Sequence, residues 1–479
     1  MFEALNDYRK VLPLLEPYEK RLAWPMPGEG WDKLPEVKKQ VILEWCDREV
    51  EKGYPMLLAT QFLAFVRSGS RKAFEDPYFA RRRTMIASAV GECLEHSDAR
   101  LDSVINGLWC TCEESYWGLS AHNGDFHGAE LGRHGLPDTY NQYIDLFAAQ
   151  TSVAIALIRR LLGDLLDAVD TRINVRLEKE LESRIFSRFM DREDYGWMGF
   201  FGQKLNNWTP WIVSSVLNAA AAVMKDDIRL AQLISRATGM LDRWLAWMPE
   251  DGGLDEGIGY WNMAGGALLD CLECLRTLSG GRIDYYDNEK VRRIGSFPLM
   301  SYIGKGWHFN FADCDARPML DGERIYIYGV RTHQPELAQL GARMGGIIVP
   351  PDTAQMNRTM DAIFTQLPEV EDPQPPARVD YDKLQVWSRS HDGLYAVIKG
   401  GHNDESHNHN DVGSFIVFAD GEPILVDAGN AVYTRQTFSD ERYTLWHIRS
   451  RNHNVPLIGE YEQAAGRQYA ASDVSASAE

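Results

Sequence analysis

Long hydrophobic runs are missing from this sequence of 479 residues, although 44% of its residues are hydrophobic. No apolar stretch reaches the roughly 20 residues that a membrane-spanning helix requires. The N-terminal segment MFEALNDYRKVLPLLEPYEKRLAWP carries charges throughout and lacks the apolar core of a secretory signal. These absences predict a cytoplasmic protein without a membrane partner, and they leave a periplasmic or secreted location open.

An excess of basic residues is also missing, because 50 lysines and arginines face 69 aspartates and glutamates, for a formal net charge of −19. Nucleic acids and anionic membranes require a basic face on their partner, so the composition argues against both. An acidic glycan would be repelled at long range and would have to be held by local groups within a Debye length of roughly 8–10 Å. The charge therefore favours a modestly charged uronate chain over a densely sulfated one.

Cysteines are few, odd in number and scattered, with seven in the whole chain. Cys271 and Cys274 form a C-x-x-C pair, but they stand in LLDCLECLRTL, whose apolar spacing is that of a helix. Two buried thiols on one helix face explain this pair better than a redox or zinc site does. Reduced cysteines agree with the cytoplasmic prediction.

Helical periodicity dominates the chain from about residue 35 to residue 300. Several of these segments are Ala-rich and apolar over most of their surface, which suits inner helices that outer ones bury. Helix–loop–helix spacing recurs without an exact sequence repeat, as in an α/α toroid. The expected helices cover residues 37–52, 82–96, 140–166, 175–190, 210–224, 228–248 and 265–279.

The periodicity changes after a proline- and acid-rich stretch, QLPEVEDPQPPARVD, which is typical of a linker. Short β-branched and aromatic strands follow, separated by turn signals such as HDG and ADGEP. The sequence therefore predicts a helical domain over residues 1–368, a linker over 369–379 and a β-domain over 380–479. The chain ends in the polar tail ASDVSASAE, so the β-domain is expected to be incomplete at its C-terminal side.

Histidines gather in the β-domain, where His407 and His409 stand two apart, Asp427 ends a strand and His453 lies in a later loop. In an extended segment the first two would point to one face, about 7 Å apart. Neutral imidazoles with a carboxylate suit Zn²⁺, although a single histidine more often only hydrogen-bonds its loop. Together they favour a metal site or an active site.

The motifs around these histidines resemble one known family. HNHNDVGSF, the G-x-P-x-x-x-D-x-G pattern from Gly421 to Gly429, the Arg442–Tyr443 pair and RNHNVP are similar to the C-terminal domain of heparinase II/III-like polysaccharide lyases. The resemblance extends back through DEGIGYWNMAGG, LNNWTPW and EESYWGLSAHN, so it spans roughly residues 105 to 465.

The resemblance implies a fold, a metal and a reaction. The fold would be multidomain, an incomplete α/α toroid followed by an antiparallel β-sandwich, with the active site in the cleft between them. A structural zinc ion would be held by His409, Asp427 and His453. The protein would be an enzyme that cleaves an acidic, uronate-containing polysaccharide or oligosaccharide by β-elimination. The sequence leaves the oligomeric state open, a homodimer included.

Elimination requires neutralisation of the uronate carboxylate, a base for the C5 proton and an acid for the leaving O4. Residue by residue, the resemblance assigns these roles to Asn207, Tyr260 and His407, with Asn206 as the alternative to its neighbour. Some relatives carry His beside the matching Asn, where Trp208 stands here. By itself, Asn207 would be taken as a helix N-cap and Tyr260 as a core aromatic, whose pKa of roughly 10 must fall before it acts as a base.

Substrate-binding candidates come from the same loops. Trp117 is a plausible stacking platform for a sugar ring, and Glu114 and His122 accompany it. Glu256 precedes Tyr260 and is placed to hydrogen-bond hydroxyls, while Arg317 would grip a second uronate with its planar guanidinium. The alternatives are caps for the acidic residues and an internal salt bridge for Arg317.

Three other functions compete with the lyase hypothesis. A glycoside hydrolase on a helical toroid would use paired carboxylates, such as Glu114 with Asp255 or Glu256. A non-catalytic glycan-binding protein would keep the structural zinc without turnover. A zinc hydrolase would use His407 and His409 together.

Overall fold

The structure of the chain is a computed structural model that describes residues 1–123, 135–346 and 355–477. The chain folds into two compact units, each assembled from several segments. Unit 1 comprises Met1–Leu245, Asp270–Asp284 and Ile347–Thr365, and unit 2 comprises Ala246–Leu269, Tyr285–Gly346 and Gln366–Glu479. The linker and domain boundaries expected from the sequence stay predictions.

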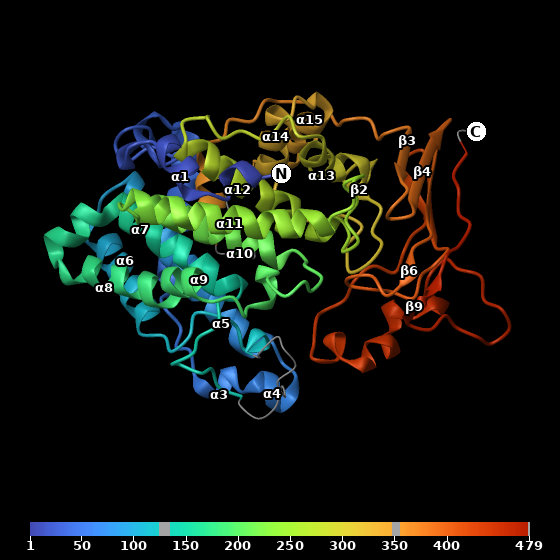
Figure 1. Cartoon of the computed structure of the whole chain (residues 1–479), viewed down its shortest axis with the longest axis horizontal. Coiled ribbons are helices and arrows are strands. Elements are labelled where there is room, and N and C mark those ends of the chain that lie inside the picture. Colours follow the sequence, from blue (N-terminus) through green and yellow to red (C-terminus); the bar gives the residue numbers. More distant parts are fainter. Residues whose placement is uncertain (124–134, 347–354, 478–479) are drawn as a thin grey trace. The chain divides into compact units, whose positions relative to one another are not determined.

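Helices fill most of the chain before residue 365 (Figure 1). The first eight are α1 (Tyr8–Val11), α2 (Glu36–Lys52), α3 (Ala59–Phe62), α4 (Ala64–Ser68), α5 (Lys72–Leu94), α6 (Asp98–Cys112), α7 (Leu146–Val169) and α8 (Arg172–Leu181). A π-helical turn over Glu182–Phe186 joins α8 to α9 (Ser187–Asp191). The remaining helices are α10 (Trp208–Val223), α11 (Asp227–Trp247), α12 (Gly265–Leu278), α13 (Glu289–Met300), α14 (Gly322–Arg331), α15 (Pro335–Met344) and α16 (Met356–Phe364).

The centre of unit 1 is the pair α7 and α10, which pack against each other. Asp145 begins α7, because its carboxylate accepts hydrogen bonds from the backbone N–H groups of Phe147 and Ala148, which have no partner inside the helix. Alanines on both helices allow close approach, and α10 is buried along nearly its whole length. Burial on almost every side matches the expectation for an inner helix of a ring.

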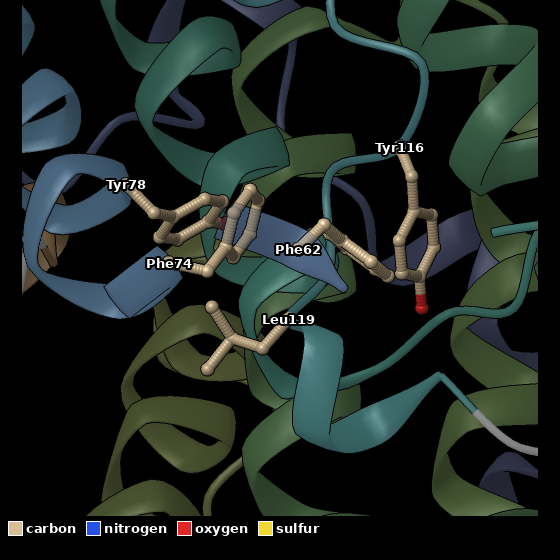
Figure 2. Close-up of a cluster of buried hydrophobic side chains, with 5 residues drawn as sticks. All are labelled: Phe62, Phe74, Tyr78, Tyr116 and Leu119. Atoms are coloured by element: carbon tan, nitrogen blue, oxygen red, sulfur yellow. The ribbon is translucent and has the colours of Figure 1, made fainter. Parts of the chain in front are cut away.

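An aromatic cluster lies at the end of unit 1 where α3 and α5 meet the segment after α6 (Figure 2). The rings of Phe62 and Phe74 meet edge to face with centroids 4.8 Å apart. The buried Tyr78 hydroxyl has a hydrogen-bond partner, because it donates to the Trp117 carbonyl at 2.5 Å. Each fully buried aromatic side chain of this kind contributes about 1.5–3 kcal/mol to folding. The members are Phe62, Phe74, Tyr78, Tyr116 and Leu119.

Unit 2 contains an antiparallel sheet with strand order β3-β4-β5-β7-β8. Alternation along its central strands separates a buried face from an exposed one, since Tyr395 pairs with Phe418 and Val397 with Ile416, all four nearly inaccessible. Two short two-stranded sheets, β1-β2 and β6-β9, complete the unit among the described residues. The strands are β1 (Tyr302–Gly304), β2 (Trp307–His308), β3 (Arg378–Tyr381), β4 (Val386–His391), β5 (Leu394–Lys399), β6 (His402–Asn403), β7 (Phe415–Ala419), β8 (Glu422–Leu425) and β9 (Gly466–Ala470).

The predicted fold class, an incomplete α/α toroid followed by an antiparallel β-sandwich, is confirmed. The seven expected helices all form, with ends shifted by a few residues in most cases, and short strands follow the proline-rich stretch as expected. The helices that were not individually expected are α1, α3, α4, α6 and α13 to α16. No helix within the described ranges is long and apolar enough to span a membrane.

Candidate active site and metal centre

Tyr260 and His407 come together in unit 2. Tyr260 lies on a 3₁₀ helix, Ile258–Met263, that begins after Gly257 in a left-handed conformation (φ 85°). A side chain at Gly257 would meet the Phe311 carbonyl oxygen at 2.7 Å, so the chain can turn there only with glycine. The Tyr260 ring packs on the His407 ring with centroids 4.2 Å apart and planes inclined by 30°. Two of the three residues predicted to be catalytic are therefore in contact.

The loop that carries His407 is fixed by a buried lysine at the end of β5. Lys399 Nζ lies 2.7 Å from Asp411 Oδ1 and 2.8 Å from Glu405 Oε2, so one cation ties both sides of the loop. Burial by itself would lower the pKa of Lys399, but the two carboxylates outweigh it and raise the pKa. The loop is not extended at His407, where φ is 53°, so the expected strand-like geometry is wrong at this residue.

Asp313 joins the histidines despite this bend. Its Oδ2 lies 2.8 Å from His407 Nδ1, and its Oδ1 lies 2.9 Å from His409 Nε2. Arg442 Nη2 donates to both carboxylate oxygens at 3.0 and 2.9 Å. Burial would raise the pKa of Asp313, but the hydrogen bonds from the two histidines and the charge of Arg442 outweigh it and hold the pKa well below its usual value. Asp313 is therefore a buried carboxylate anion at neutral pH.

Tyr433 extends this network to Tyr260. The hydroxyl oxygens of the two tyrosines lie 2.6 Å apart. The Tyr433 hydroxyl donates to Asp313 Oδ2 at 3.1 Å and lies 3.3 Å from His407 Nδ1. Burial, the neighbouring phenol of Tyr260 and the Asp313 carboxylate all raise the pKa of Tyr433, so it stays protonated and can donate.

Beside this network, His409, Asp427 and His453 form a buried group with one candidate ligand atom each, all within 4.8 Å of one another. His409 Nδ1 and His453 Nε2 are buried and have no hydrogen-bond partner among the described residues. Unpaired imidazole nitrogens in a protein interior are costly unless something accepts their lone pairs. The donor set therefore fits a divalent metal ion that prefers nitrogen and oxygen ligands.

Asn207 and Asn206 lie at the start of α10 in unit 1. Asn207 occupies the N-cap position and is 4% exposed, but its side chain makes no capping hydrogen bond. Asn206 Oδ1 instead accepts from the backbone N–H of Trp208 at 3.1 Å. The simple N-cap explanation for Asn207 is therefore not supported, and its catalytic role stays a prediction.

His122 lies close to this turn. Its ring packs against Trp208 with centroids 4.8 Å apart and stacks on Phe147 at 5.7 Å. His122 Nδ1 is 2.8 Å from Asp145 Oδ2, the same carboxylate that begins α7. The structure thus brings His122 beside the residue that follows Asn207.

Glu114 and Trp117 are held in the interior of unit 1. Glu114 Oε1 and Oε2 lie 2.5 and 2.6 Å from the two terminal nitrogens of Arg82, and Arg81 adds a third contact at 2.9 Å. Trp117 is 1% exposed, and the Arg184 guanidinium lies 4.8 Å from its ring centre. Sugar binding by either residue stays a prediction, and the contacts present are those of packing and ion pairing.

Glu256 and Arg317 belong to unit 2. Glu256 is 2% exposed in the loop before the helix of Tyr260. The guanidinium of Arg317 lies 4.1 Å above the Trp307 ring, a cation–π contact that leaves its side chain largely in solvent. The substrate contacts predicted for Glu256 and Arg317 stay predictions.

Sequence reasoning missed the members that link the site together. Tyr433 and Asp313 gave no signal in the sequence, and Arg442 counted only as part of a motif. Their meeting depends on the loop of Asp313, which is at least 120 residues from the segment that carries Tyr433 and Arg442. A buried acid flanked by Cys314 and followed by Arg317 is too common a pattern to identify it.

Comparisons with known proteins agree with the C-terminal motifs. Residues 373–478 match the family described as Heparinase II/III-like, C-terminal. No curated protein sequence matches the chain.

Solved structures resemble the chain over most of its length. Heparinase III matches with a TM-score of 0.60 at 12% identity, covering 96% of this chain and 68% of that one. A heparinase III with methylated lysines gives 0.52 at 12% identity, covering 93% and 65%. A mutant of the heparan sulfate lyase HepC from Pedobacter heparinus gives 0.50 at 13% identity, covering 93% and 64%.

At such low identity these likenesses show the fold alone. The chain also spans only about two thirds of the length of these structures. The structural likeness nevertheless includes residues 373–478, which the family model matches and which carry the His-rich loop. Residues 373–478 therefore form a heparinase II/III-like C-terminal domain, and the resemblance of the chain to the heparinase II/III-like polysaccharide lyases is confirmed.

Proposed function

We propose that the protein is a polysaccharide lyase that cleaves uronate-containing glycans by β-elimination. The observation that carries the proposal is the contact between Tyr260 and His407, whose rings lie 4.2 Å apart within one hydrogen-bonded network. A phenol and an imidazole side by side are suited to remove one proton and deliver another. The solved structures with this fold, named as heparinase III and a heparan sulfate lyase, support the reaction class.

The proposed reaction needs one base and one acid, and Tyr260 and His407 supply both. A base takes the C5 proton of the uronate, the freed electron pair forms the C4–C5 double bond, and the C4–O4 bond breaks. An acid then protonates the leaving O4. Since His407 Nδ1 faces Asp313, the other ring nitrogen of His407 is left for substrate, and Tyr260 and His407 divide the roles of base and acid.

Asn207 is proposed to stabilise the carboxylate of the uronate as charge develops on it. Its amide N–H groups can donate to a carboxylate oxygen without needing a metal. Its 4% exposure and the lack of a capping bond leave this side chain without an evident role in starting α10. His122 and Asn206 are proposed to bind sugar near it, and Glu114, Trp117, Glu256 and Arg317 remain proposed substrate contacts.

Zinc is the metal that we propose for His409, Asp427 and His453. The ion would hold three distant segments of unit 2 together and would stabilise the fold. It has no step in the proposed reaction, because His407 faces Asp313 and is not one of the three candidate ligands.

A glycoside hydrolase is supported less well by the site. Both oxygens of Glu114 are engaged by the Arg82 guanidinium, so neither is free to contact a glycosidic oxygen. An inverting or retaining pair would need a second carboxyl at a matching distance, and Glu114 already serves an ion pair.

Product chemistry tests the proposal. The protein is incubated with a panel of uronate polysaccharides, and the unsaturated product of elimination is followed by its ultraviolet absorbance. Tyr260→Phe should abolish the absorbance while the melting temperature and the metal content stay unchanged. New reducing ends without that absorbance would indicate hydrolysis, and near-normal turnover of the variant would remove Tyr260 from the mechanism.

A further inference from the structure

The two carboxylate oxygens of Asp313 contact two histidines of different proposed function. Oδ2 lies 2.8 Å from His407 Nδ1, and Oδ1 lies 2.9 Å from His409 Nε2. The Asp313 side chain is fully buried, so water does not compete for either oxygen. A carboxylate accepts hydrogen bonds only, and therefore each histidine must present an N–H to it.

This fixes a different tautomer at each ring. His407 carries its proton on Nδ1, which leaves the Nε2 lone pair for a substrate proton. His409 carries its proton on Nε2, which leaves its Nδ1 lone pair for a metal ion. That Nδ1 atom is buried without a hydrogen-bond partner among the described residues and belongs to the group with Asp427 and His453.

We propose that Asp313 is a positioning residue. Its single carboxylate orients both a histidine of the candidate metal centre and the histidine proposed to be catalytic. The inference rests on the proposed lyase function for its catalytic half only. Arg442 neutralises the carboxylate through contacts at 2.9 and 3.0 Å, which keeps Asp313 an anion in the interior and in a fixed orientation. Metal affinity and turnover are therefore coupled through a residue that touches neither metal nor substrate.

The geometry distinguishes the two halves of this role. A free imidazole favours the Nε2–H tautomer, so His409 would keep its tautomer in part without Asp313, whereas His407 needs the carboxylate to hold the less favoured Nδ1–H form. The loss of Asp313 should thus change His407 more than His409.

The test uses the full chain with zinc and three variants. Asp313→Asn removes the charge and one acceptor, Asp313→Glu keeps the charge opposite Arg442, and Asp315→Asn makes the same chemical change at an exposed position two residues along the loop. Imidazole nitrogen NMR reports the tautomers of His407 and His409, and competition with a chelator reports zinc affinity. Steady-state kinetics on the best uronate substrate separate kcat from KM.

The wild type should show the Nδ1–H form at His407 and the Nε2–H form at His409. In Asp313→Asn we expect His407 to change tautomer, zinc affinity to fall toward the lower end of a range of about 10–100-fold, and kcat to fall toward its upper end with KM within about threefold. Asp313→Glu should recover part of each loss, and it carries the test if the asparagine variant does not fold. Asp315→Asn should match the wild type.

An unchanged His407 tautomer in both Asp313 variants would overturn the inference. So would a loss of turnover without a loss of zinc affinity, or the reverse, because the carboxylate would then serve only one site. If the wild type eliminates no uronate substrate, the proposed function fails, while the tautomer and zinc measurements still decide whether Asp313 orders both rings.

Discussion

The hydroxyl oxygens of Tyr260 and Tyr433 lie 2.6 Å apart, although the residues come from the 3₁₀ helix Ile258–Met263 and from a segment after β8. Tyr433 in turn donates to the buried Asp313 carboxylate. The bond to Tyr433 gives the Tyr260 proton a defined partner, and the anion behind it orients both phenols.

Tyr433→Phe should lower kcat by about 10–100-fold, because Tyr260 loses the partner that orients its hydroxyl. KM should change little, since the ring and its packing remain. Steady-state kinetics on a uronate polysaccharide measure both. Tyr461→Phe is the matched control, because Tyr461 is 84% exposed in the same unit. Equal effects of the two substitutions would remove Tyr433 from the site.

His409→Gln should reduce bound zinc and lower the melting temperature, since one of three ligands is lost and metal binding is coupled to folding. Elemental analysis after dialysis and a thermal melt with and without chelator measure the two effects. His391→Gln serves as the control, as His391 is exposed on β4. Full zinc content in the His409 variant would show that the metal binds elsewhere.

The free energy of unfolding should fall as the pH is lowered, because of the buried His308 on β2. Burial lowers the pKa of His308 to about 3, whereas the unfolded chain titrates near 6.5. Between these values the unfolded state binds the extra proton, so the stabilisation is complete above pH 6.5 and is lost as the pH falls. The slope is about 1.4 kcal/mol per pH unit.

Comparison with His308→Gln isolates this contribution. The difference in free energy of unfolding between wild type and variant should shrink by about 2 kcal/mol from pH 7.5 to pH 5, as measured by urea unfolding. A difference that does not depend on pH would show that His308 titrates normally in the folded protein.

Glu114→Gln should destabilise unit 1 by about 3–5 kcal/mol, because it leaves the buried Arg82 guanidinium without its counter-charge. Both partners are almost inaccessible, with 4% and 2% exposed side chains. Glu113→Gln, one residue earlier and exposed, is the matched control in urea unfolding. A stable Glu114 variant that has lost only turnover would instead assign this carboxylate to the substrate.

Much of the candidate metal centre could be predicted from the sequence. The motifs that carry the family resemblance indicated His409, Asp427 and His453, and the structure brings their ligand atoms within 4.8 Å of one another. The helices and strands could also be predicted, since apolar residues recur every 3.6 or 2 positions along the sequence. The bend at His407 could not be predicted, because a left-handed backbone conformation at a residue other than glycine has no signature in the sequence.

The sequence by itself therefore determined the succession of helices and strands and the His-rich loop, because both depend on spacing along the chain, and its resemblance to a known family indicated the three candidate metal ligands. Only the tertiary structure decided that Asp313 and Tyr433 contact His407 and that Arg442 contacts Asp313. Asp313 is separated from its four partners by 94 to 129 residues of chain, and the burial that makes one carboxylate accept all four exists only after the chain has folded.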